Sequence, residues 1–379
     1  MIGHKRIPSR EGGIEIVVEE LSTRLVQMGH SVTVYNRQGR HVSDKDADLE
    51  AHKLTEYKGI RIVRVPTPDN KAMNALVYSF IATIFALLGN YDVIHYHAEG
   101  PCLMLIIPHI FGIRTIATIH GLDWQRSKWG GLATRVLKMG ERTAAKYADE
   151  VIVLSEHVQQ YFKETYNRDT IYIQNGVSRT EFRDPDIITK AFELEKEKYI
   201  LYLGRLVPEK GITYLLEAFA GIDTDMKLVI AGGTSHSDEY VELIKEMAEK
   251  DERVILTGFV QGELLSELYT NAYLYVLPSD VEGMPISLLE AMSFGLRCLA
   301  SDIPENTEAC QEFAWYFKSG DVEDLRHRLT DAISRPDAFH NKEEIIDYCF
   351  RRFNWDKVTG ASARLYIDAI LNVERIDNI

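Results

Sequence analysis

The chain has 379 residues, 45% of them hydrophobic and 26% charged, which is long enough for two globular domains. Its net charge of −14 is unevenly divided: 22 Lys and Arg stand against 19 Asp and Glu through residue 180, and 21 against 38 in the remainder. An acidic second half argues against nucleic-acid binding. No apolar leader follows Met1, so we expect a cytoplasmic protein.

The mildly basic first half allows peripheral contact with an anionic membrane, or with a phosphorylated acceptor, although so small an excess can also be without meaning. The longest apolar stretch, 75–88, is shorter than the roughly 20 residues that span a bilayer. We expect this stretch to form a buried or membrane-touching helix.

Short apolar segments alternate with helical ones in the first half of the chain. Strands are predicted at 31–35, 60–65, 92–97, 115–119 and 150–154, and helices at 14–28 and 132–147. Only Met1 and Ile2 precede the first glycine, so the first strand is predicted to be short or truncated.

The same alternation continues in the second half. Strands are predicted at 199–203, 227–231, 254–257, 274–277 and 298–300, and helices at 214–220, 239–249 and 287–293. The pattern pauses between 176 and 198, which indicates a linker. We therefore predict an α/β fold of two doubly wound, Rossmann-like domains, 1–180 and 181–355, facing a central cleft with the ligand at the carboxyl ends of the strands.

Two cations lie on a predicted loop between a strand and a helix. Arg205 and Lys210 follow the strand 199–203 in the sequence G-R-L-V-P-E-K-G. A bidentate guanidinium and a point-charge ammonium at this spacing can grip a diphosphate from two sides. Donors aimed at a departing diphosphate act where negative charge develops. For this string alone, a solvated loop is the alternative.

Two glutamates, Glu282 and Glu290, stand with seven residues between them. The first follows a strand, and the second lies on the helix 287–293. The turn between them is formed by Gly283, Met284 and Pro285. A carboxylate accepts hydrogen bonds from two adjacent hydroxyls, so Glu290 suits a ribose, while Glu282 and the turn suit the sugar or phosphate of a sugar nucleotide. Two surface glutamates are the alternative.

Two further segments precede or follow predicted elements of the first domain. Gly12 and Gly13 stand before the helix 14–28, where paired glycines let the backbone approach an anion. His120 follows the strand 115–119 and is placed to donate to a sugar hydroxyl or to polarise the reacting centre. A tight turn and a structural histidine are the respective alternatives.

The sequence predicts no metal site and no cofactor. His95 and His97 share one face of a strand, but no third ligand with suitable spacing follows them. The three D-x-D strings at 46–48, 184–186 and 223–225 are discounted, because such triples arise by chance among 57 acidic residues.

Taken together, these segments resemble retaining glycosyltransferases of family 4. The motifs that carry the resemblance are G-G at 12–13, H-G at 120–121, N-G-V at 175–177, G-R-L-x-x-E-K-G at 204–211, E-G-M-P-I-S-L-L-E-A-M at 282–292 and A-S-D-I-P-E at 300–305. They extend over nearly the full length. One departure is Leu296-Arg297, where the family commonly has a proline.

The resemblance implies a GT-B fold, retention of anomeric configuration and no required metal. It implies that Arg205 and Lys210 hold the donor diphosphate, that Glu290 holds the ribose, and that Glu282 and His120 flank the sugar. It also implies that the last helix, 356–379, crosses back onto the first domain.

The function that follows is transfer of a hexose from a nucleotide-sugar, with a UDP-sugar as the commonest family choice, to a lipid-linked or polysaccharide acceptor in bacterial surface glycan synthesis. The loop I-P-S-R-E-G-G-I-E resembles that of rhamnosyltransferases, so a dTDP-rhamnose donor is an alternative. A GT-B sugar-nucleotide epimerase and a non-catalytic sugar-nucleotide-binding subunit are alternatives of another class.

Overall fold

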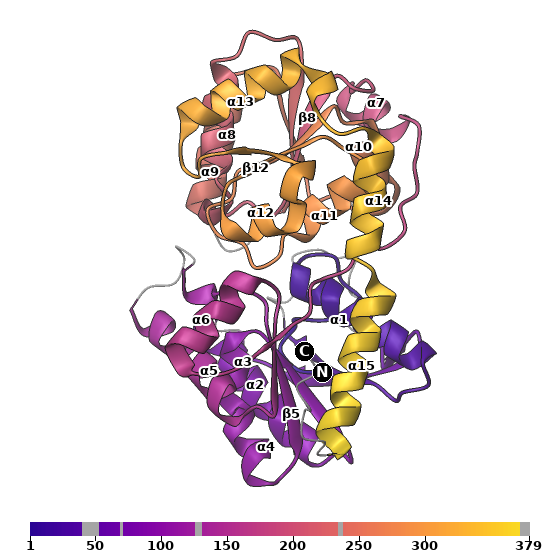
Figure 1. Ribbon diagram of the computed structural model, residues 1–379, viewed down its shortest axis with the longest axis vertical. Helices are drawn as coiled ribbons and strands as arrows, with labels where there is room; N and C mark the ends of the chain where they lie inside the picture. Colours follow the sequence, from indigo (N-terminus) through magenta and orange to yellow (C-terminus); the bar gives the residue numbers. More distant parts are fainter. Residues whose placement is uncertain (40–52, 69–70, 126–130, 234–237, 372–379) are drawn as a thin grey trace. The chain divides into compact units, whose positions relative to one another are not determined.

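The computed structural model describes residues 1–39, 53–68, 71–125, 131–233 and 238–371 (Figure 1). Its contacts divide the chain into two compact units. Unit 1 comprises Met1–Asn175 and Trp355–Ile379, and unit 2 comprises Gly176–Asn354. The boundaries inferred from the sequence, after residues 180 and 355, lie a few residues away from these.

Unit 1 is built on parallel strands. The sheet β4-β5-β6-β7 is parallel throughout, and β1 pairs in parallel with β3 while β2 forms an antiparallel edge. The strands are β1 Thr33–Gln38, β2 Glu56–Tyr57, β3 Ile60–Pro66, β4 Val93–His97, β5 Arg114–Ile119, β6 Glu150–Val153 and β7 Ile171–Tyr172.

The predicted short first strand is a single bridge in the structure. Ile2 pairs in parallel with Tyr96 of β4, and its backbone exchanges hydrogen bonds with His95 O (2.9 Å) and His97 N (2.8 Å). On the other side, Tyr35 N of β1 donates to Met1 O (3.1 Å). The first two residues therefore join the two sheets of unit 1, and Ile2 is fully buried.

The helices of unit 1 pack against the strands of its two sheets. They are α1 Gly13–Gln27, α2 Lys71–Leu87, α3 Glu99–Cys102, η4 Leu103–Leu105, α4 Ile106–Ile110, η5 Asp123–Gln125, α5 Leu132–Tyr147, α6 Glu156–Tyr166 and α15 Trp355–Leu371. The yellow helix α15 packs against α1, β4 and β5 (Figure 1), and Tyr366 of this helix is hydrogen-bonded to His95 Nδ1 (2.8 Å). Within the described ranges, no helix combines the length and the apolarity that crossing a membrane requires.

Unit 2 has one parallel sheet in the order β10-β9-β8-β11-β12-β13. Its strands are β8 Tyr199–Leu203, β9 Lys227–Ala231, β10 Val254–Gly258, β11 Leu274–Leu277, β12 Cys298–Ser301 and β13 Trp315–Phe317. The central strands β8 and β11 are almost wholly apolar and buried, as expected of parallel strands covered on both faces.

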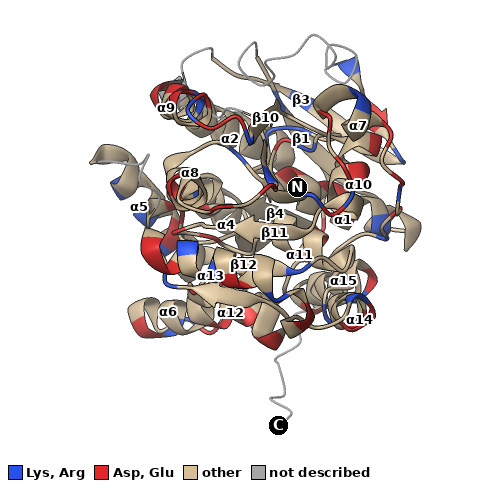
Figure 2. Ribbon diagram, turned by 90° about the horizontal axis from the view of Figure 1, so that it is seen from above, with Lys and Arg blue, Asp and Glu red and all other residues tan. Residues whose placement is uncertain are grey.

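The helices of unit 2 pack on this sheet, α8 against α9 and α13, and α11 against α14. They are α7 Ile187–Phe192, η6 Pro208–Lys210, α8 Ile212–Ala220, α9 Asp238–Ala248, α10 Gly262–Asn271, α11 Ile286–Ser293, α12 Pro304–Cys310, η7 Gln311–Phe313, α13 Val322–Ser334, η8 Pro336–Ala338 and α14 Lys342–Arg352. The acidic composition of this half is visible on α9 (Figure 2), which has four acidic residues and one lysine.

The α/β prediction is confirmed, and the long apolar elements fall where they were expected. Strands 199–203, 227–231 and 274–277 and helix 132–147 match the structure. The predictions omit the short edge strands β2, β7 and β13, because two or three residues carry no readable period. They also omit several helices, including α14, although Asn341 and Glu344 form a capping box that marks its start.

One loop of unit 2 depends on a glycine. Gly211 ends η6 with φ +63°, and a Cβ on it would lie 2.0 Å from the backbone oxygen of Pro278. Gly258 has a similar φ of +70° with nothing within 4 Å of such a Cβ. Alanine at Gly258 therefore adds backbone strain alone, whereas alanine at Gly211 adds the same strain and a steric overlap with Pro278.

We predict that Gly258→Ala lowers the free energy of unfolding by about 1–2 kcal/mol, the cost of a left-handed backbone for alanine. Gly211→Ala should cost clearly more, because the Pro278 carbonyl must also move. Urea unfolding followed by circular dichroism measures both values. Equal losses would show that the loop accommodates the methyl group freely.

Candidate active site

The predicted site residues of unit 2 meet where the strand order reverses. From β8 the sheet continues through β9 and β10 on one side, and through β11, β12 and β13 on the other. Arg205 follows the carboxyl end of β8, and Glu282 follows that of β11. Such a switch point leaves a crevice outside the sheet, because the loops on its two sides lead away in opposite directions.

Lys210 and Glu282 are in direct contact at this place. Lys210 Nζ, at the end of η6, donates to Glu282 Oε1, and the two side chains are only 13% and 8% exposed. The loops that carry them are also joined by Asp280 N, which donates to Glu209 O (2.9 Å). Because both charges are largely withdrawn from water, each depends on the other for compensation. An anion that binds Lys210 must compete with Glu282.

Two buried tyrosines that the sequence did not point to hold Glu290 and the start of its helix. The hydroxyl of Tyr269 lies 3.2 Å from Glu290 Oε2 and 3.1 Å from Ser287 O. The hydroxyl of Tyr275 lies 2.8 Å from Ser287 Oγ and 3.1 Å from Leu203 O. Burial raises the pKa of both tyrosines well above 10, so they stay neutral hydrogen-bond donors at pH 7.

The backbone of Arg205 is held by a third buried tyrosine, Tyr202 of β8. Tyr202 OH donates to Arg205 O (3.2 Å). Burial raises the pKa of Tyr202, the negative charge of Glu282 raises it further, and the guanidinium of Arg205 opposes the shift. The charges of both Glu282 and Arg205 therefore act on the pKa of Tyr202. A short strand made wholly of apolar and aromatic residues, Y-I-L-Y-L, was the signal for this buried tyrosine.

Glu209 is a further residue of this site that was not predicted from the sequence. It precedes Lys210, is 4% exposed, and neither carboxylate oxygen has a hydrogen-bond partner among the described residues. A buried carboxylate without donors is costly, so water or a bound ligand has to supply them.

The turn between the two glutamates leads directly into α11. Gly283 and Met284 precede Pro285, which is the N-cap residue and accepts from Leu288 N and Leu289 N (both 3.1 Å). The first turn of α11 contains no acidic residue. The positive end of the helix is therefore not neutralised by the helix's own side chains, which suits an anionic group.

His120 belongs to unit 1 and is buried after the end of β5. Its Nε2 lies 3.0 Å from Nδ1 of His97, so one ring donates and the other accepts. Burial lowers the pKa of His97 well below 6.5, with further contributions from the neighbouring histidines. His97 Nε2 has no partner among the described residues, and the less costly arrangement leaves it as an unprotonated acceptor. His97 Nδ1–H then donates to His120.

The glycine pair also lies in unit 1. Gly12 is the N-cap of α1 in an extended conformation, and Gly13 is the first residue of the helix. A Cβ on Gly12 would lie 2.3 Å from Glu15 Oε2, and Glu15 Oε1 accepts from Lys5 N (2.8 Å). The helix N-terminus is thus next to a carboxylate of its own first turn, a feature that sequence reasoning did not anticipate.

The histidine pair and the two D-x-D strings that lie in the described residues form hydrogen bonds or flank secondary-structure elements. His95 lies 2.7 Å from Thr118 Oγ1 in addition to its contact with Tyr366. Asp186 is the N-cap of α7, and 223–225 precedes β9. The string at 46–48 lies outside the described residues. In the described ranges, no three His, Cys, Asp or Glu side chains are grouped so as to hold a metal ion.

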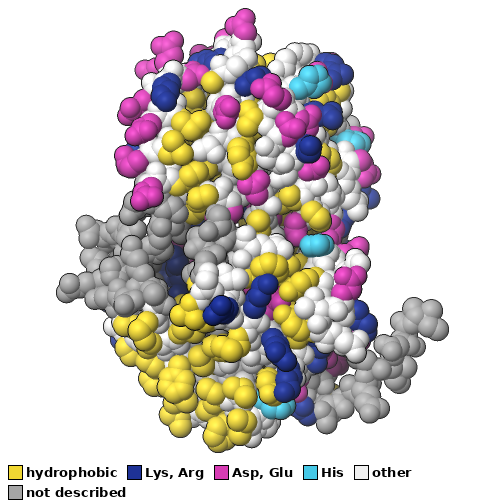
Figure 3. All heavy atoms as spheres, turned by 90° about the vertical axis from the view of Figure 1, so that its left-hand side faces the viewer, with side chains coloured by type: hydrophobic (Ala, Val, Ile, Leu, Met, Phe, Trp, Pro, Cys, Tyr) yellow, Lys and Arg dark blue, Asp and Glu magenta, His cyan; other side chains and the backbone are white. Residues whose placement is uncertain are grey.

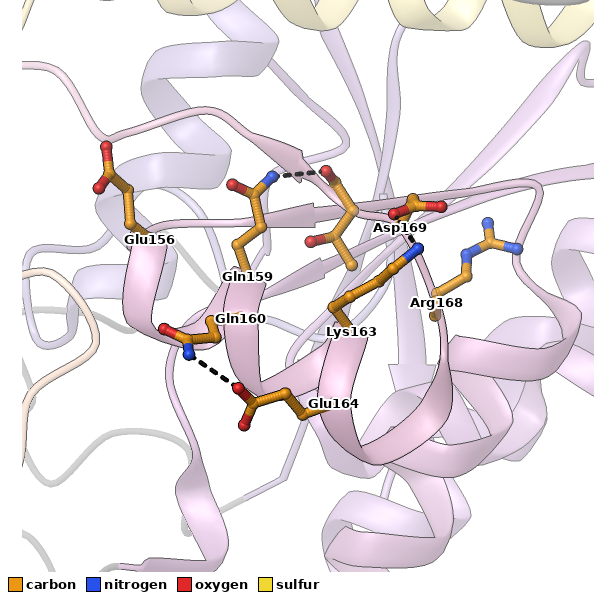
Figure 4. A pocket seen from close by; sticks show the side chains of 8 residues that line it. Glu156, Gln159, Gln160, Lys163, Glu164, Arg168 and Asp169 are labelled. Carbon is orange, nitrogen blue, oxygen red and sulfur yellow. Dashed lines mark hydrogen bonds and ion pairs between the residues drawn. The ribbon is translucent and has the colours of Figure 1, made fainter.

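A surface depression of about 310 Å³ lies on α6 of unit 1 (Figure 4). Its lining is polar and of mixed charge: Glu156, Gln159, Gln160, Lys163, Glu164, Arg168, Asp169 and Thr170. Lys163 is paired with Asp169, and Gln160 with Glu164. None of the predicted site residues lines this depression.

Both halves of the chain match families of known proteins. A family described as glycosyl transferases group 1 matches residues 184–348, and one described as Glycosyltransferase Family 4 matches residues 11–181. The chain is 28% identical to an uncharacterised glycosyltransferase of Methanocaldococcus jannaschii, covering 95% of each. It is 28% identical to the UDP-Gal:α-D-GlcNAc-diphosphoundecaprenol α-1,3-galactosyltransferase of Escherichia coli, covering 85% of this chain and 88% of the relative.

A third relative is a GDP-mannose-dependent α-(1-6)-phosphatidylinositol monomannoside mannosyltransferase of Mycobacterium tuberculosis, 26% identical over 86% of each chain. Among solved structures, sucrose-phosphate synthase from Thermosynechococcus elongatus superposes with a TM-score of 0.83 at 21% identity, covering 98% of each chain. Anabaena HepE in complex with UDP-glucose superposes at 0.78 and 17% identity, covering 97% of this chain and 98% of that one.

Two Rossmann-like units with parallel sheets, together with these neighbours, define an enzyme of the GT-B class that transfers a glycosyl group. Glycosyltransferase family models match both halves of the chain, and the resemblance to glycosyltransferases of family 4 noted in its sequence is confirmed.

We predict that Tyr269→Phe weakens binding of a nucleoside diphosphate several-fold, because Glu290 loses the hydroxyl that orients it. It should also cost about 1 kcal/mol of stability. Tyr199→Phe is the matched control, since the hydroxyl of Tyr199 is likewise buried and donates to a backbone oxygen, that of Leu268 (2.7 Å). Calorimetric titration should show weaker binding only in the first variant.

The buried histidines predict a pH dependence of stability. Burial lowers the pKa of His95 well below 6.5, whereas the unfolded chain takes up this proton near pH 6.5. The unfolded state thus binds more protons below that pH, and the free energy of unfolding falls as the pH is lowered. His95→Gln should reduce this slope below pH 6 by up to about 1.4 kcal/mol per pH unit.

Denaturant midpoints of the wild type and His95→Gln, measured from pH 8 to pH 5, test this prediction. Taking the difference between the two proteins cancels the contribution of the titrating groups that His95 does not influence, which excludes His97. Identical slopes would show that His95 takes up its proton in the folded state as well.

Proposed function

We propose that this glycosyltransferase transfers a hexose from a UDP-sugar to a lipid-linked or polysaccharide acceptor, with retention of anomeric configuration and without a required metal. The observation that carries the proposal is the contact between Lys210 and Glu282 at the switch point of unit 2, where Arg205 follows β8 and Glu290 lies on α11. Cations for a diphosphate and carboxylates for hydroxyls are the groups that a sugar nucleotide requires.

In this proposal the cations act on the leaving group. Lys210 exchanges Glu282 for the donor diphosphate, and Arg205 binds the same phosphates. Both stabilise the charge that develops on the diphosphate as the glycosidic bond breaks. The acceptor hydroxyl attacks from the face of the leaving group, and a phosphate oxygen takes its proton.

The remaining residues orient the donor. Glu290, held by Tyr269, accepts from the ribose hydroxyls. Glu282, once released from Lys210, accepts from hydroxyls of the transferred sugar, and the backbone of Gly283, Met284 and Pro285 meets the sugar or phosphate. Gly12 and Gly13 offer the backbone at the start of α1, and neutral His120 donates to the sugar.

The nature of donor and acceptor is supported by the relatives. UDP-glucose is bound in Anabaena HepE, and the relative from E. coli uses UDP-Gal on a diphosphoundecaprenol-linked sugar. The mycobacterial relative depends on GDP-mannose and acts on a phosphatidylinositol mannoside. We therefore place a UDP-sugar first, keep GDP-mannose and dTDP-rhamnose as competing donors, and propose an acceptor of bacterial surface glycan synthesis reached at the inner face of the plasma membrane.

The ion pair provides a sharp test of these roles. Lys210→Gln should weaken both UDP and UDP-glucose by about 10- to 100-fold, the loss of one charged hydrogen bond. Glu282→Gln should leave UDP binding unchanged or tighter, because Lys210 no longer has an internal competitor. It should weaken UDP-glucose relative to UDP.

Calorimetry with UDP, UDP-glucose, GDP, GDP-mannose and dTDP measures these affinities and ranks the bases. Lys250→Gln, an exposed position of unit 2, is the control for removal of one positive charge. Equal losses of UDP affinity in Lys210→Gln and Glu282→Gln would contradict the assigned roles. Transfer in excess chelator should continue undiminished, and loss of transfer there would overturn the metal-independent mechanism.

A further inference from the structure

Unit 1 has an apolar surface on three neighbouring helices, α2, α4 and α5, which contact one another in this order. Nine of the fifteen large hydrophobic side chains exposed in the described residues lie on these helices or directly after them. They are Met73, Phe80, Phe85, Leu88, Ile106, Ile110, Phe111, Leu132 and Met139. We call this surface the α2–α4–α5 face. Single exposed apolar residues need no explanation, but a gathering of this kind marks an interaction site.

The same face is basic along α5. Arg135, Lys138, Arg142 and Lys146 recur every three or four residues and are exposed, so they follow one side of the helix between Leu132 and Met139 and beyond. The only acidic residue of α5, Glu141, is fully buried and accepts from Trp124 Nε1 (3.0 Å) and Tyr161 OH (2.8 Å).

Acidic residues are missing from the sequence of the other two helices as well. Residues 72–91 contain no charged side chain, and residues 100–122 contain no Asp or Glu, in a chain that has 57 of them. Figure 3 shows hydrophobic side chains gathered at the bottom of the view, with Lys and Arg side chains beside them. A solvated helix face would mix both signs of charge with its apolar residues.

Apolar side chains flanked by cations, on three helices that expose no carboxylate, complement the surface of an anionic bilayer. Ile110 and Phe111, at the tip between α4 and β5, are 72% and 69% exposed and can enter the acyl boundary, while the α5 cations reach the phosphates. We propose that the α2–α4–α5 face binds unit 1 to membranes rich in anionic phospholipid, with Ile110, Phe111 and Leu132 inserted.

This placement extends the proposed function to the physical form of the acceptor. Helix α5 leaves the carboxyl edge of the sheet, the edge of His120, and returns over about 24 Å to the amino end of β6. A lipid-linked acceptor held in the bilayer beside α5 would thus be near the edge where transfer is proposed. The binding itself is measured without any transfer, so its failure is distinct from failure of the proposed activity.

The experiment is flotation of the full-length protein with vesicles of phosphatidylcholine alone, or with about one third phosphatidylglycerol. Arg135→Gln, Arg142→Gln and Lys146→Gln are combined in one variant. Its matched control combines Lys190→Gln, Lys250→Gln and Lys318→Gln, three exposed cations of unit 2, so that the net charge changes equally.

We expect the wild type to float with the anionic vesicles and much less with the neutral ones. Each basic side chain at an anionic surface raises partition about five-fold. The α5 variant should therefore lose about 100-fold, while the control changes little. Wild-type partition that does not depend on phosphatidylglycerol, or equal losses in the two variants, would overturn the proposal.

Insertion is tested by Phe111→Cys carrying an environment-sensitive fluorophore, which labels selectively because all four native cysteines are buried. Its emission should shift to the blue with anionic vesicles, whereas Leu243→Cys on unit 2 should not respond. Sedimentation of the lipid-free protein tests whether a second copy of the chain covers this face instead. A dimer that dissociates in the double variant Ile110→Ser, Phe111→Ser would show that it does, and would contradict membrane binding.

Discussion

The parallel pairing of β8 with β11 is the constraint on which the candidate active site depends. It places the loop after Leu203 beside the loop after Leu277, although more than seventy residues separate them in the chain. Only this neighbourhood allows Lys210 to meet Glu282. Because both side chains are largely buried, the pair compensates two charges that would otherwise be costly, and it keeps the cation in place until an anion replaces the carboxylate.

The tyrosines under this site connect its chemistry to the core. Three of the largest fully buried side chains are Tyr202, Tyr269 and Tyr275. Each forms a hydrogen bond through its hydroxyl to a loop or to the start of α11. Burial keeps them neutral, so they act as fixed donors. A change in the packing of unit 2 would therefore alter the orientation of Glu290 as well as stability.

Unit 1 has two distinct features of functional interest, the predicted site residues and the α2–α4–α5 face. Its buried histidines lie on β4 and directly after β5, next to the bridge between Ile2 and Tyr96, and the glycine pair begins α1. The α2–α4–α5 face lies on the helices and is apolar and basic. The overall charge of −14 conceals this face, because most of the acidic excess lies in unit 2.

The sequence by itself determined the α/β class, the long central strands and the residues of the chemistry-bearing loops, because apolar periodicity and local motifs are properties of contiguous residues. It did not determine that Lys210 pairs with Glu282, that Tyr269 orients Glu290, or that Glu15 lies beside Gly12, because these contacts depend on strand order and on side-chain direction. Edge strands of two or three residues were also decided by tertiary pairing. The three-dimensional packing alone revealed which apolar residues of 72–91 and 103–147 remain exposed on one face.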